Sequence, residues 1–249
     1  MKKTTSWGNV AKWYDSLLEG NEDTYQSKVI LPNLIRNLSL KKGERVLDIA
    51  CGQGFFSREL YKQGAEVSGV DISKKLIKIA EKNSPRQIYF HSTNVSTMPM
   101  FENNYFDKAI SILALQNIED IDGALHEIAR VLKKGGSLFI VLNHPTFRIL
   151  KRSSWERDSH DKQYRRIDSY LSESKENIQM HPGSNPEIKT ISFNRSLQIY
   201  FKMFRKNGFV VRSLEEWVSH KKSEGKHAKE ENRIRGEIPL FMFLEIIKL

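Results

Sequence analysis

The sequence predicts an α/β fold in which a mostly parallel sheet carries helices on both faces. Short apolar segments alternate with helical patterns from about residue 45 to residue 142, and strands connected by helices of this length pair in parallel. The chain has 249 residues, which suits one doubly wound domain with an added cap or insertion. Hydrophobic residues make up 39% and charged residues 28% of the chain, which is enough apolar side chain for a folded core.

The expected elements follow from hydrophobic spacing and from glycine or polar residues at their ends. Two helices should precede the sheet, the first with apolar side chains at helical spacing over residues 7–18 and the second from about Asp23 to Leu38. Seven strands are expected at Arg45–Ile49, Glu66–Val70, Ile88–His91, Phe106–Leu113, Ser137–Leu142, Phe209–Val218 and Leu240–Leu249. Helices are expected at Gly54–Gln63, Ser73–Asn83, Ile121–Lys134 and Arg195–Asn207. Two lysines and two glycines at residues 133–136 indicate the end of the third of these helices.

The alternation of strands and helices stops after Pro145. We expect one domain over residues 1–249, with a helical cap at 1–40 and an insertion at 145–191 that covers the substrate. The insertion is polar and rich in arginine, serine and aspartate. A second polar and basic segment, residues 219–237, is expected to be either a loop or a helix.

The charge balance favours anionic partners, but it does not identify one. Lysine and arginine number 40 against 30 acidic residues, a net charge of +10, which suits RNA or nucleotides, although the lysines are scattered. The single cysteine excludes an intramolecular disulfide and a cysteine-rich zinc site. The histidines lack metal-ligand spacing, so no metal is expected. No apolar segment is long enough to insert in a membrane and no secretory signal is visible, so a cytoplasmic location is expected.

The most specific motif is the strand and glycine turn at residues 46–56. Asp48 lies four residues before Gly52, and Asp71 ends the next strand. The glycines allow a sharp turn, and a carboxylate at the end of the second strand can accept hydrogen bonds from both hydroxyls of a ribose. Ser57 occupies the third small position of the dinucleotide fingerprint, and the phosphate-binding glycine-lysine motif is absent. The ligand therefore has a ribose but need not have a pyrophosphate.

Four segments resemble the motifs of class I S-adenosylmethionine-dependent methyltransferases. Residues 47–54 (LDIACGQG) resemble their first motif, and residues 69–73 resemble the ribose-binding end of their second strand. Residues 106–116 are similar to their fourth strand and the turn after it, and residues 130–136 to the turn before their fifth strand. The four segments stand in the family's order and spacing. The closest resemblance is to the small-molecule branch that includes ubiquinone- and menaquinone-biosynthesis methyltransferases, the methyltransferase domain 11 type.

The resemblance implies a Rossmann-like sheet of seven strands, with the last strand antiparallel beside the fifth, and S-adenosyl-L-methionine as cofactor. It implies that Asp48 orients the turn or reaches the methionine amine and that Asp71 holds the ribose. Asn94 stands where the family usually has an aspartate facing the adenine amine. The candidate cofactor residues are Asp48, Ala50, Cys51, Gly52, Gln53, Gly54, Asp71, Ile72, Asn94, Val95, Leu113, Gln116, Tyr14 and Tyr25. For the apolar and aromatic residues among them, ordinary packing in the core or between helices is the alternative to a contact with the cofactor.

The residues that would bind the methyl acceptor have a less specific sequence signal than the cofactor motifs. His144 follows the fifth strand, where a base can take a proton from a hydroxyl acceptor, although a loop histidine without a chemical role is an equal alternative. Tyr164, Arg165, Arg166 and Tyr170 in the insertion are candidates for substrate binding, with a solvated surface as the alternative. Cys51 is interpreted as a buried inert thiol rather than a nucleophile.

Three functions fit these patterns. The first is methyl transfer from S-adenosylmethionine to a small organic acceptor by in-line displacement, driven mainly by proximity and desolvation. The second is methylation of RNA, which the net charge suggests but which no appended RNA-binding module supports. The third is a non-catalytic cofactor-binding protein of the same fold, which the intact glycines and aspartates of the motifs disfavour. The sequence indicates neither the atom methylated nor the oligomeric state.

Overall fold

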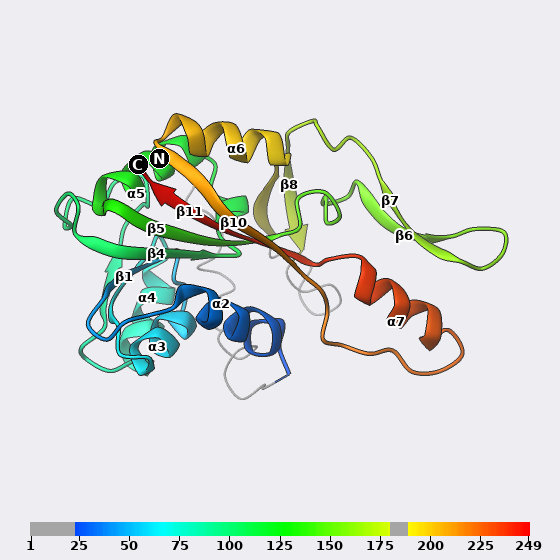
Figure 1. Ribbon diagram of the computed structural model, residues 1–249, viewed down its shortest axis with the longest axis horizontal. Helices are drawn as coiled ribbons and strands as arrows, with labels where there is room; N and C mark the ends of the chain where they lie inside the picture. The colour runs from blue at the N-terminus through cyan, green and yellow to red at the C-terminus, as the bar shows by residue number, and fades with distance from the viewer. Residues whose placement is uncertain (1–22, 180–188) are drawn as a thin grey trace.

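The central feature of the computed structural model, which describes residues 23–179 and 189–249, is a sheet of seven strands (Figure 1). The strand order is β10-β11-β5-β4-β1-β2-β3. The strands are β1 (Arg45–Ile49), β2 (Glu66–Asp71), β3 (Tyr89–Ser92), β4 (Phe106–Ile112), β5 (Leu132–Asn143), β10 (Phe209–Trp217) and β11 (Phe241–Lys248). Strands β1 to β5 are parallel, and β11 is antiparallel to both β5 and β10. The predicted doubly wound sheet, with its last strand beside the fifth, is confirmed.

Helices cover both faces of the sheet. One face carries η1 (Gln26–Ile30), α2 (Leu31–Leu38), α3 (Phe55–Lys62) and α4 (Lys74–Asn83), and the other carries α5 (Ile121–Val131) and α6 (Leu197–Lys206). Strand β5 shows why both faces of the sheet are apolar and buried. Its Leu138 and Ile140 belong to the core under α5 and α6, whereas Phe139 and Val141 belong to the core under α2 and α3. Successive side chains of a strand point to opposite faces, so a strand buried on both sides is apolar throughout.

The helix expected at residues 121–134 is three residues shorter in the structure. It ends at Val131, and Leu132 already pairs with Phe106 as the first residue of β5. Lys133 then contacts the Asp107 carboxylate at 2.5 Å instead of capping the helix. Cations and glycines mark a helix end, but here they belong to the irregular start of a strand, where Gly135 has a φ of +75°. The helix expected over residues 7–18 lies outside the described residues.

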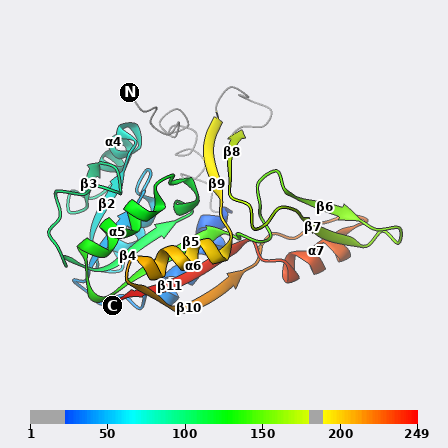
Figure 2. The ribbon, with the colours of Figure 1, turned by 90° about the horizontal axis from the view of Figure 1, so that it is seen from above.

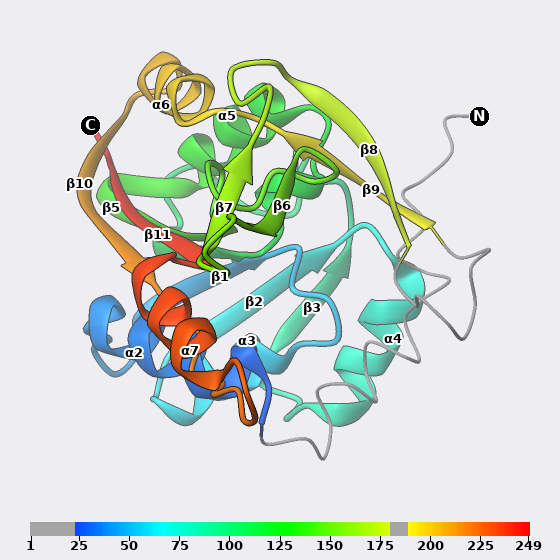
Figure 3. The same cartoon turned by 90° about the vertical axis from the view of Figure 1, so that its right-hand side faces the viewer.

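The insertion contains strands that the polar sequence did not predict. It forms a hairpin of β6 (Ser153–Arg157) and β7 (Gln163–Ile167) and contributes β8 (Ser174–Gln179) to a ribbon with β9 (Lys189–Asn194). Helix α7 (Ala228–Glu237), from the second polar segment, lies beside the β6–β7 hairpin (Figure 2). We call β6, β7 and α7 together the arm. The arm lies in front of the carboxyl ends of the parallel strands, with β8 and β9 to one side of it (Figure 3).

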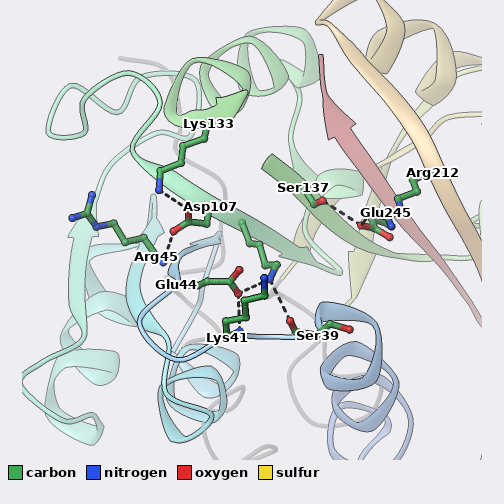
Figure 4. A network of polar contacts seen from close by, with 10 residues as sticks. Ser39, Lys41, Glu44, Arg45, Asp107, Lys133, Ser137, Arg212 and Glu245 are labelled. Atoms are coloured by element: carbon green, nitrogen blue, oxygen red, sulfur yellow. Dashed lines mark hydrogen bonds and ion pairs between the residues drawn. The ribbon is translucent and has the colours of Figure 1, made fainter. Parts of the chain in front are cut away.

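Paired charges occupy the opposite, amino edge of the sheet (Figure 4). The Asp107 carboxylate accepts hydrogen bonds from the Arg45 amide at 2.9 Å and from Lys133. The Glu44 carboxylate pairs with Lys108. These contacts join the starts of β1, β4 and β5 through paired charges.

The described residues contain no helix both long and apolar enough to cross a membrane. In the same part of the chain, no three histidine, cysteine, aspartate or glutamate residues gather as metal ligands would.

Candidate functional site

The loop after β1 has an unusual backbone. Ala50, Gly52 and Gly54 all have positive φ values, of +54°, +57° and +82°. A Cβ atom on Gly54 would lie 3.0 Å from the Phe90 ring, so this position favours glycine for both space and conformation. Ala50 has no such freedom, and a side chain in the left-handed region costs about 1 kcal/mol or more. This strain at the carboxyl edge points to a functional turn.

A second strained turn lies beside the first. Leu113, directly after β4, has a φ of +54° and leads into the short helix η2 (Leu115–Asn117). Strands β1 and β4 are neighbours, with Ile49 opposite Ser111, so the two turns leave the same edge of the sheet side by side. Ligands of open α/β sheets bind outside this carboxyl edge.

Asp71 joins the end of β2 to the first turn. Its two carboxylate oxygens accept hydrogen bonds from the Gly52 amide at 3.0 Å and the Ser73 amide at 2.8 Å. Burial raises the pKa of Asp71, and the two amides lower it in part. The carboxylate keeps further lone pairs for hydroxyl donors. The next side chain, Ile72, is 40% exposed, as expected of an apolar residue that packs against a ligand.

Asp48 lies deeper, under the loop. It is 2% exposed and accepts a hydrogen bond from the Ser57 hydroxyl at 2.6 Å. Burial raises the pKa of Asp48 to about 7, and the nearby charge of Asp71 adds to this effect. Burial also raises the pKa of the Cys51 thiol well above its ordinary value, so the sulfur stays neutral and unreactive.

Several buried polar atoms at this edge have no hydrogen-bond partner among the described residues, and three of them follow or end β1 and β4. They are Gln53 Nε2 after β1, Ser111 Oγ near the end of β4, and Gln116 Oε1 in η2. A buried polar group without a partner costs about 1–3 kcal/mol, and native proteins rarely leave several together. A ligand with several polar groups would satisfy them. With Asp71 and the glycine turn, they fit a nucleoside such as the one in S-adenosylmethionine.

Arg195 holds the turn that carries Gln116. Its guanidinium is almost fully buried and donates hydrogen bonds to the carbonyls of Ile118 and Glu119, both at 2.9 Å, and of Leu115 at 3.4 Å. These carbonyls end η2 and have few other partners. Arg195 therefore holds η2 in position through these three carbonyls.

The other cofactor candidates are spread around the edge. Asn94 is exposed, and its side-chain oxygen accepts a hydrogen bond from the Ser96 amide at 3.0 Å. Val95 and Leu113 pack against the two core clusters. The hydroxyl of Tyr25 lies 3.2 Å from the hydroxyl of Ser219, beyond the end of β10. Tyr14 lies outside the described residues.

Both ring nitrogens of His144 are engaged. Nδ1 accepts hydrogen bonds from the amides of Thr146 and Phe147, at 3.2 and 3.4 Å, which assigns the proton to Nε2. Nε2 lies 2.7 Å from the Glu216 carboxylate and donates to it. Burial lowers the pKa of His144, and Glu216 opposes this in part. The geometry leaves neither nitrogen free to take a proton from an acceptor, so it favours a structural role over that of a base.

Two of the four substrate candidates in the insertion, Arg165 and Tyr170, contact the body of the protein, and the other two lie on the outer face of the hairpin. The Tyr164 hydroxyl donates to Glu156 at 3.1 Å, and Arg166 lies 3.8 Å from the same carboxylate on the outer face of the hairpin. The Tyr170 hydroxyl accepts a hydrogen bond from the Leu197 amide at 3.0 Å. Arg165 points the other way and contacts the Phe147 carbonyl.

Sequence reasoning missed several residues of this edge. Ser111 left a visible signal, because a polar residue interrupts an otherwise apolar buried strand. Arg195 left none, since its role depends on which carbonyls the fold brings near it.

Comparison with known proteins finds methyltransferases similar to this chain. Residues 47–140 match the model of a methyltransferase domain family. The chain is 37% identical over 111 residues to the demethylmenaquinone methyltransferase of Tropheryma whipplei, covering 43% of this chain and 46% of that protein. It is 35% identical over 134 residues to the demethylmenaquinone methyltransferase of Corynebacterium kroppenstedtii, covering 53% and 55%. The chain thus spans about half the length of the curated relatives it matches.

Solved structures share the fold over nearly the whole chain. An S-adenosylmethionine-dependent methyltransferase from Mesorhizobium loti superposes with a TM-score of 0.70 at 22% identity, covering 91% of this chain and 99% of that one. A Haloferax volcanii methyltransferase, solved with the Trm112 activator, superposes with a TM-score of 0.69 at 18% identity and 99% coverage of both chains. Residues 47–140 therefore match the methyltransferase domain family, and the chain has the fold of the solved S-adenosylmethionine-dependent methyltransferases.

Proposed function

We propose that this chain transfers a methyl group from S-adenosylmethionine to a small organic acceptor. The observation that carries the proposal is the set of unpartnered buried polar atoms of Gln53, Ser111 and Gln116, which lies at the carboxyl edge of a methyltransferase domain. The demethylmenaquinone methyltransferases among its relatives support an organic ring as acceptor.

The chain supplies each part that the cofactor needs. Asp71 accepts hydrogen bonds from the ribose hydroxyls, and the backbone of residues 50–54 surrounds the methionine part. Ile72 offers an exposed apolar surface to the adenine. When bound, S-adenosylmethionine supplies a methyl group already activated on a sulfonium. The protein therefore needs only to align the acceptor and exclude water.

The insertion at residues 145–191 completes the acceptor side of the proposal. Strand β9, which pairs with the insertion's β8, reaches the site through Ser192, whose hydroxyl donates to the Gln116 carbonyl at 3.1 Å. The arm lies in front of the same edge (Figure 3). These segments choose the acceptor, while the motifs between β1 and β5 hold the cofactor.

Two measurements test the proposal. Calorimetry with S-adenosylhomocysteine should show binding to the full chain, and lack of binding would refute the cofactor assignment. Incubation with S-adenosylmethionine labelled in the methyl group, together with either a metabolite extract or purified RNA, should then label a small molecule. Label in the RNA fraction alone would favour the RNA alternative, and binding without any transfer would favour a non-catalytic protein.

A further inference from the structure

Two arginines near the end of β5 have no carboxylate partner in the described part of the chain. They are Arg148, in the turn after β5, and Arg165, on β7 of the arm. Neighbouring arginines of the arm are paired: Arg157 lies 3.2 Å from Asp161, and Arg166 lies 3.8 Å from Glu156. The hairpin of the arm therefore pairs its outward-facing arginines with carboxylates, whereas Arg165 on the other face of β7 and Arg148 in the turn before it have no such partner among the described residues.

The guanidinium of Arg165 is held in place by neutral groups. Its Nε donates to the Phe147 carbonyl at 2.8 Å and one terminal nitrogen donates to the Ser153 hydroxyl at 2.6 Å. The guanidinium also lies over the Trp155 ring, 5.0 Å from its centroid. These contacts fix its orientation without neutralising it, and they leave its other terminal nitrogen free to donate. A fixed planar guanidinium is the group that best binds carboxylates and phosphates.

The turn that carries Arg148 is rigid for a separate reason. His144 accepts hydrogen bonds from the two following amides through Nδ1, and its carbonyl accepts one from the Arg148 amide at 2.9 Å. The Phe147 carbonyl, one residue before Arg148, is the group that Arg165 contacts. The two arginines are thus brought together by backbone contacts. The Arg148 side chain is exposed, so its guanidinium is accessible to a ligand.

The two positive charges act on each other. Burial lowers the pKa of Arg165, and the like charge of Arg148 lowers it further. The pKa of Arg148 is lowered as well, because neighbouring protein atoms partly desolvate its guanidinium even though the residue as a whole is exposed, and the Tyr25 phenol opposes this effect. Both groups remain charged at neutral pH, since the ordinary pKa of arginine exceeds 12. Two neighbouring like charges without a counter-ion are stabilised by an anion from solution.

The aromatic surroundings indicate what carries that anion. The Trp155 ring lies beside the guanidinium of Arg165, the Phe147 ring lies against His144 at 4.7 Å between centroids, and the Tyr25 ring lies against Phe241 at 5.6 Å. Phe241 pairs with Asn143, so this patch stands at the carboxyl end of β5. It is two strands from β1 and the cofactor loop, along the same edge.

We propose that Arg148 and Arg165 together bind an anionic group, a carboxylate or a phosphate, on the ring of the methyl acceptor. The proposal rests on the proposed methyl transfer and narrows its acceptor to an acid. Both arginines lie outside residues 47–140, the part that matches the domain family, so the family resemblance does not assign this role.

The test uses three ring compounds that differ only in their charged group: benzoate, phenyl phosphate and neutral benzamide. Each is titrated by calorimetry into the full chain saturated with S-adenosylhomocysteine. One or both anions should bind, and benzamide should bind at least about tenfold more weakly. The tighter anion identifies the group as a carboxylate or a phosphate. No binding of either anion, or equal binding of benzamide, would overturn the proposal.

Variants decide which residues are responsible. Arg148→Gln and Arg165→Gln should each weaken binding of the anion about tenfold, and Arg165→Lys should restore only part of it. Arg166→Gln is the matched control, because it removes the same charge from the neighbouring residue on the other face of β7. An equal loss in the control would show a non-specific charge effect and overturn the proposal.

Binding of S-adenosylhomocysteine by each variant separates the two hypotheses. If the wild-type chain binds S-adenosylhomocysteine but no anion, only the anion site is refuted. If it binds no S-adenosylhomocysteine, the proposed function itself fails. Variants that bind S-adenosylhomocysteine as the wild type does are folded, so a loss of anion binding in them cannot result from misfolding.

Discussion

The two edges of the central sheet differ in how their polar groups are paired. At the amino edge, Asp107 and Glu44 are paired with Lys133 and Lys108, and Figure 4 shows the contacts running from strand to strand. At the carboxyl edge, buried atoms such as Ser111 Oγ have no partner, and residues in two adjacent turns have strained backbones. The strands therefore begin among paired charges and end beside buried polar atoms that have no partner among the described residues. Stability and ligand binding should therefore respond to substitutions at opposite edges.

The largest expected effect is on cofactor affinity. Asp71→Ala removes two charge-assisted hydrogen bonds to the ribose, each worth about 1.5–3 kcal/mol, so affinity for S-adenosylhomocysteine should fall about 100-fold or more. Calorimetry measures this directly. Asp107→Ala, an equal change at the amino edge, should leave the affinity unchanged. Similar affinities for wild type and Asp71→Ala would show that the ribose binds elsewhere.

The next effect concerns the buried carboxyl of Asp48. Its pKa is about 7 in the folded chain and about 4 in the unfolded chain, so the folded protein holds a proton that the unfolded protein has lost between these values. The free energy of unfolding should therefore fall as the pH rises from about 4 to about 7. Asp48→Asn has no titrating group at this position, so its stability relative to the wild type should be higher at pH 8 than at pH 4 by on the order of 4 kcal/mol. Urea denaturation at these two pH values measures the difference, and a constant difference would contradict the raised pKa.

A smaller effect of opposite sign is expected at the amino edge. Burial raises the pKa of Asp107, but the hydrogen bonds from Lys133 and Arg45 outweigh it, so the pKa lies below its usual range. The paired carboxylate therefore stabilises the fold above pH about 4 and loses this effect as the pH falls through its lowered pKa. Asp107→Ala should reduce the free energy of unfolding by about 1 kcal/mol at pH 7. Denaturation at lower pH should show the gap closing, and a gap that widens in acid would refute this assignment.

The smallest effect is expected from His144. Removal of a general base usually slows a reaction about 100-fold to 10,000-fold. Since both ring nitrogens of His144 are occupied within the protein, His144→Gln should slow methyl transfer less than about tenfold. Glu216→Gln is the companion variant and should behave alike. A loss of 100-fold or more in His144→Gln alone would restore His144 as a base.

The difference between the edges also explains what the sequence predicted well. Strands and helices of the sheet follow from apolar spacing, and the sharp turns after β1 left a glycine signal, because local chemistry determines both. The end of α5 was misplaced because lysines and glycines at residues 133–136 suit a helix end and a strand bulge equally. In the structure, Lys133 pairs with Asp107 at the start of β4, and residues 132–136 belong to β5 rather than to the helix.

The acceptor side was predicted least well. The two hairpins of the insertion have no apolar alternation, since their strands are short and half-exposed. Arg165 lies near Arg148 because it contacts the backbone carbonyl of Phe147, and no spacing in the sequence reveals this contact. Roles that depend on contacts between distant segments stay hidden until the fold is known.

The arm is assembled from two separate parts of the chain, and this has a consequence for how specificity can change. The β6–β7 hairpin leaves the sheet after β5, whereas α7 is inserted between β10 and β11. The two halves meet through the Gln163 amide, which donates to Glu230 at 3.3 Å, and through His227, which lies 3.5 Å from Asp161. A hairpin transplanted from a relative without its matching helix would meet the wrong partners. If the arm chooses the acceptor, as we propose, a change of acceptor requires the hairpin and the helix to be exchanged, or to evolve, as a pair.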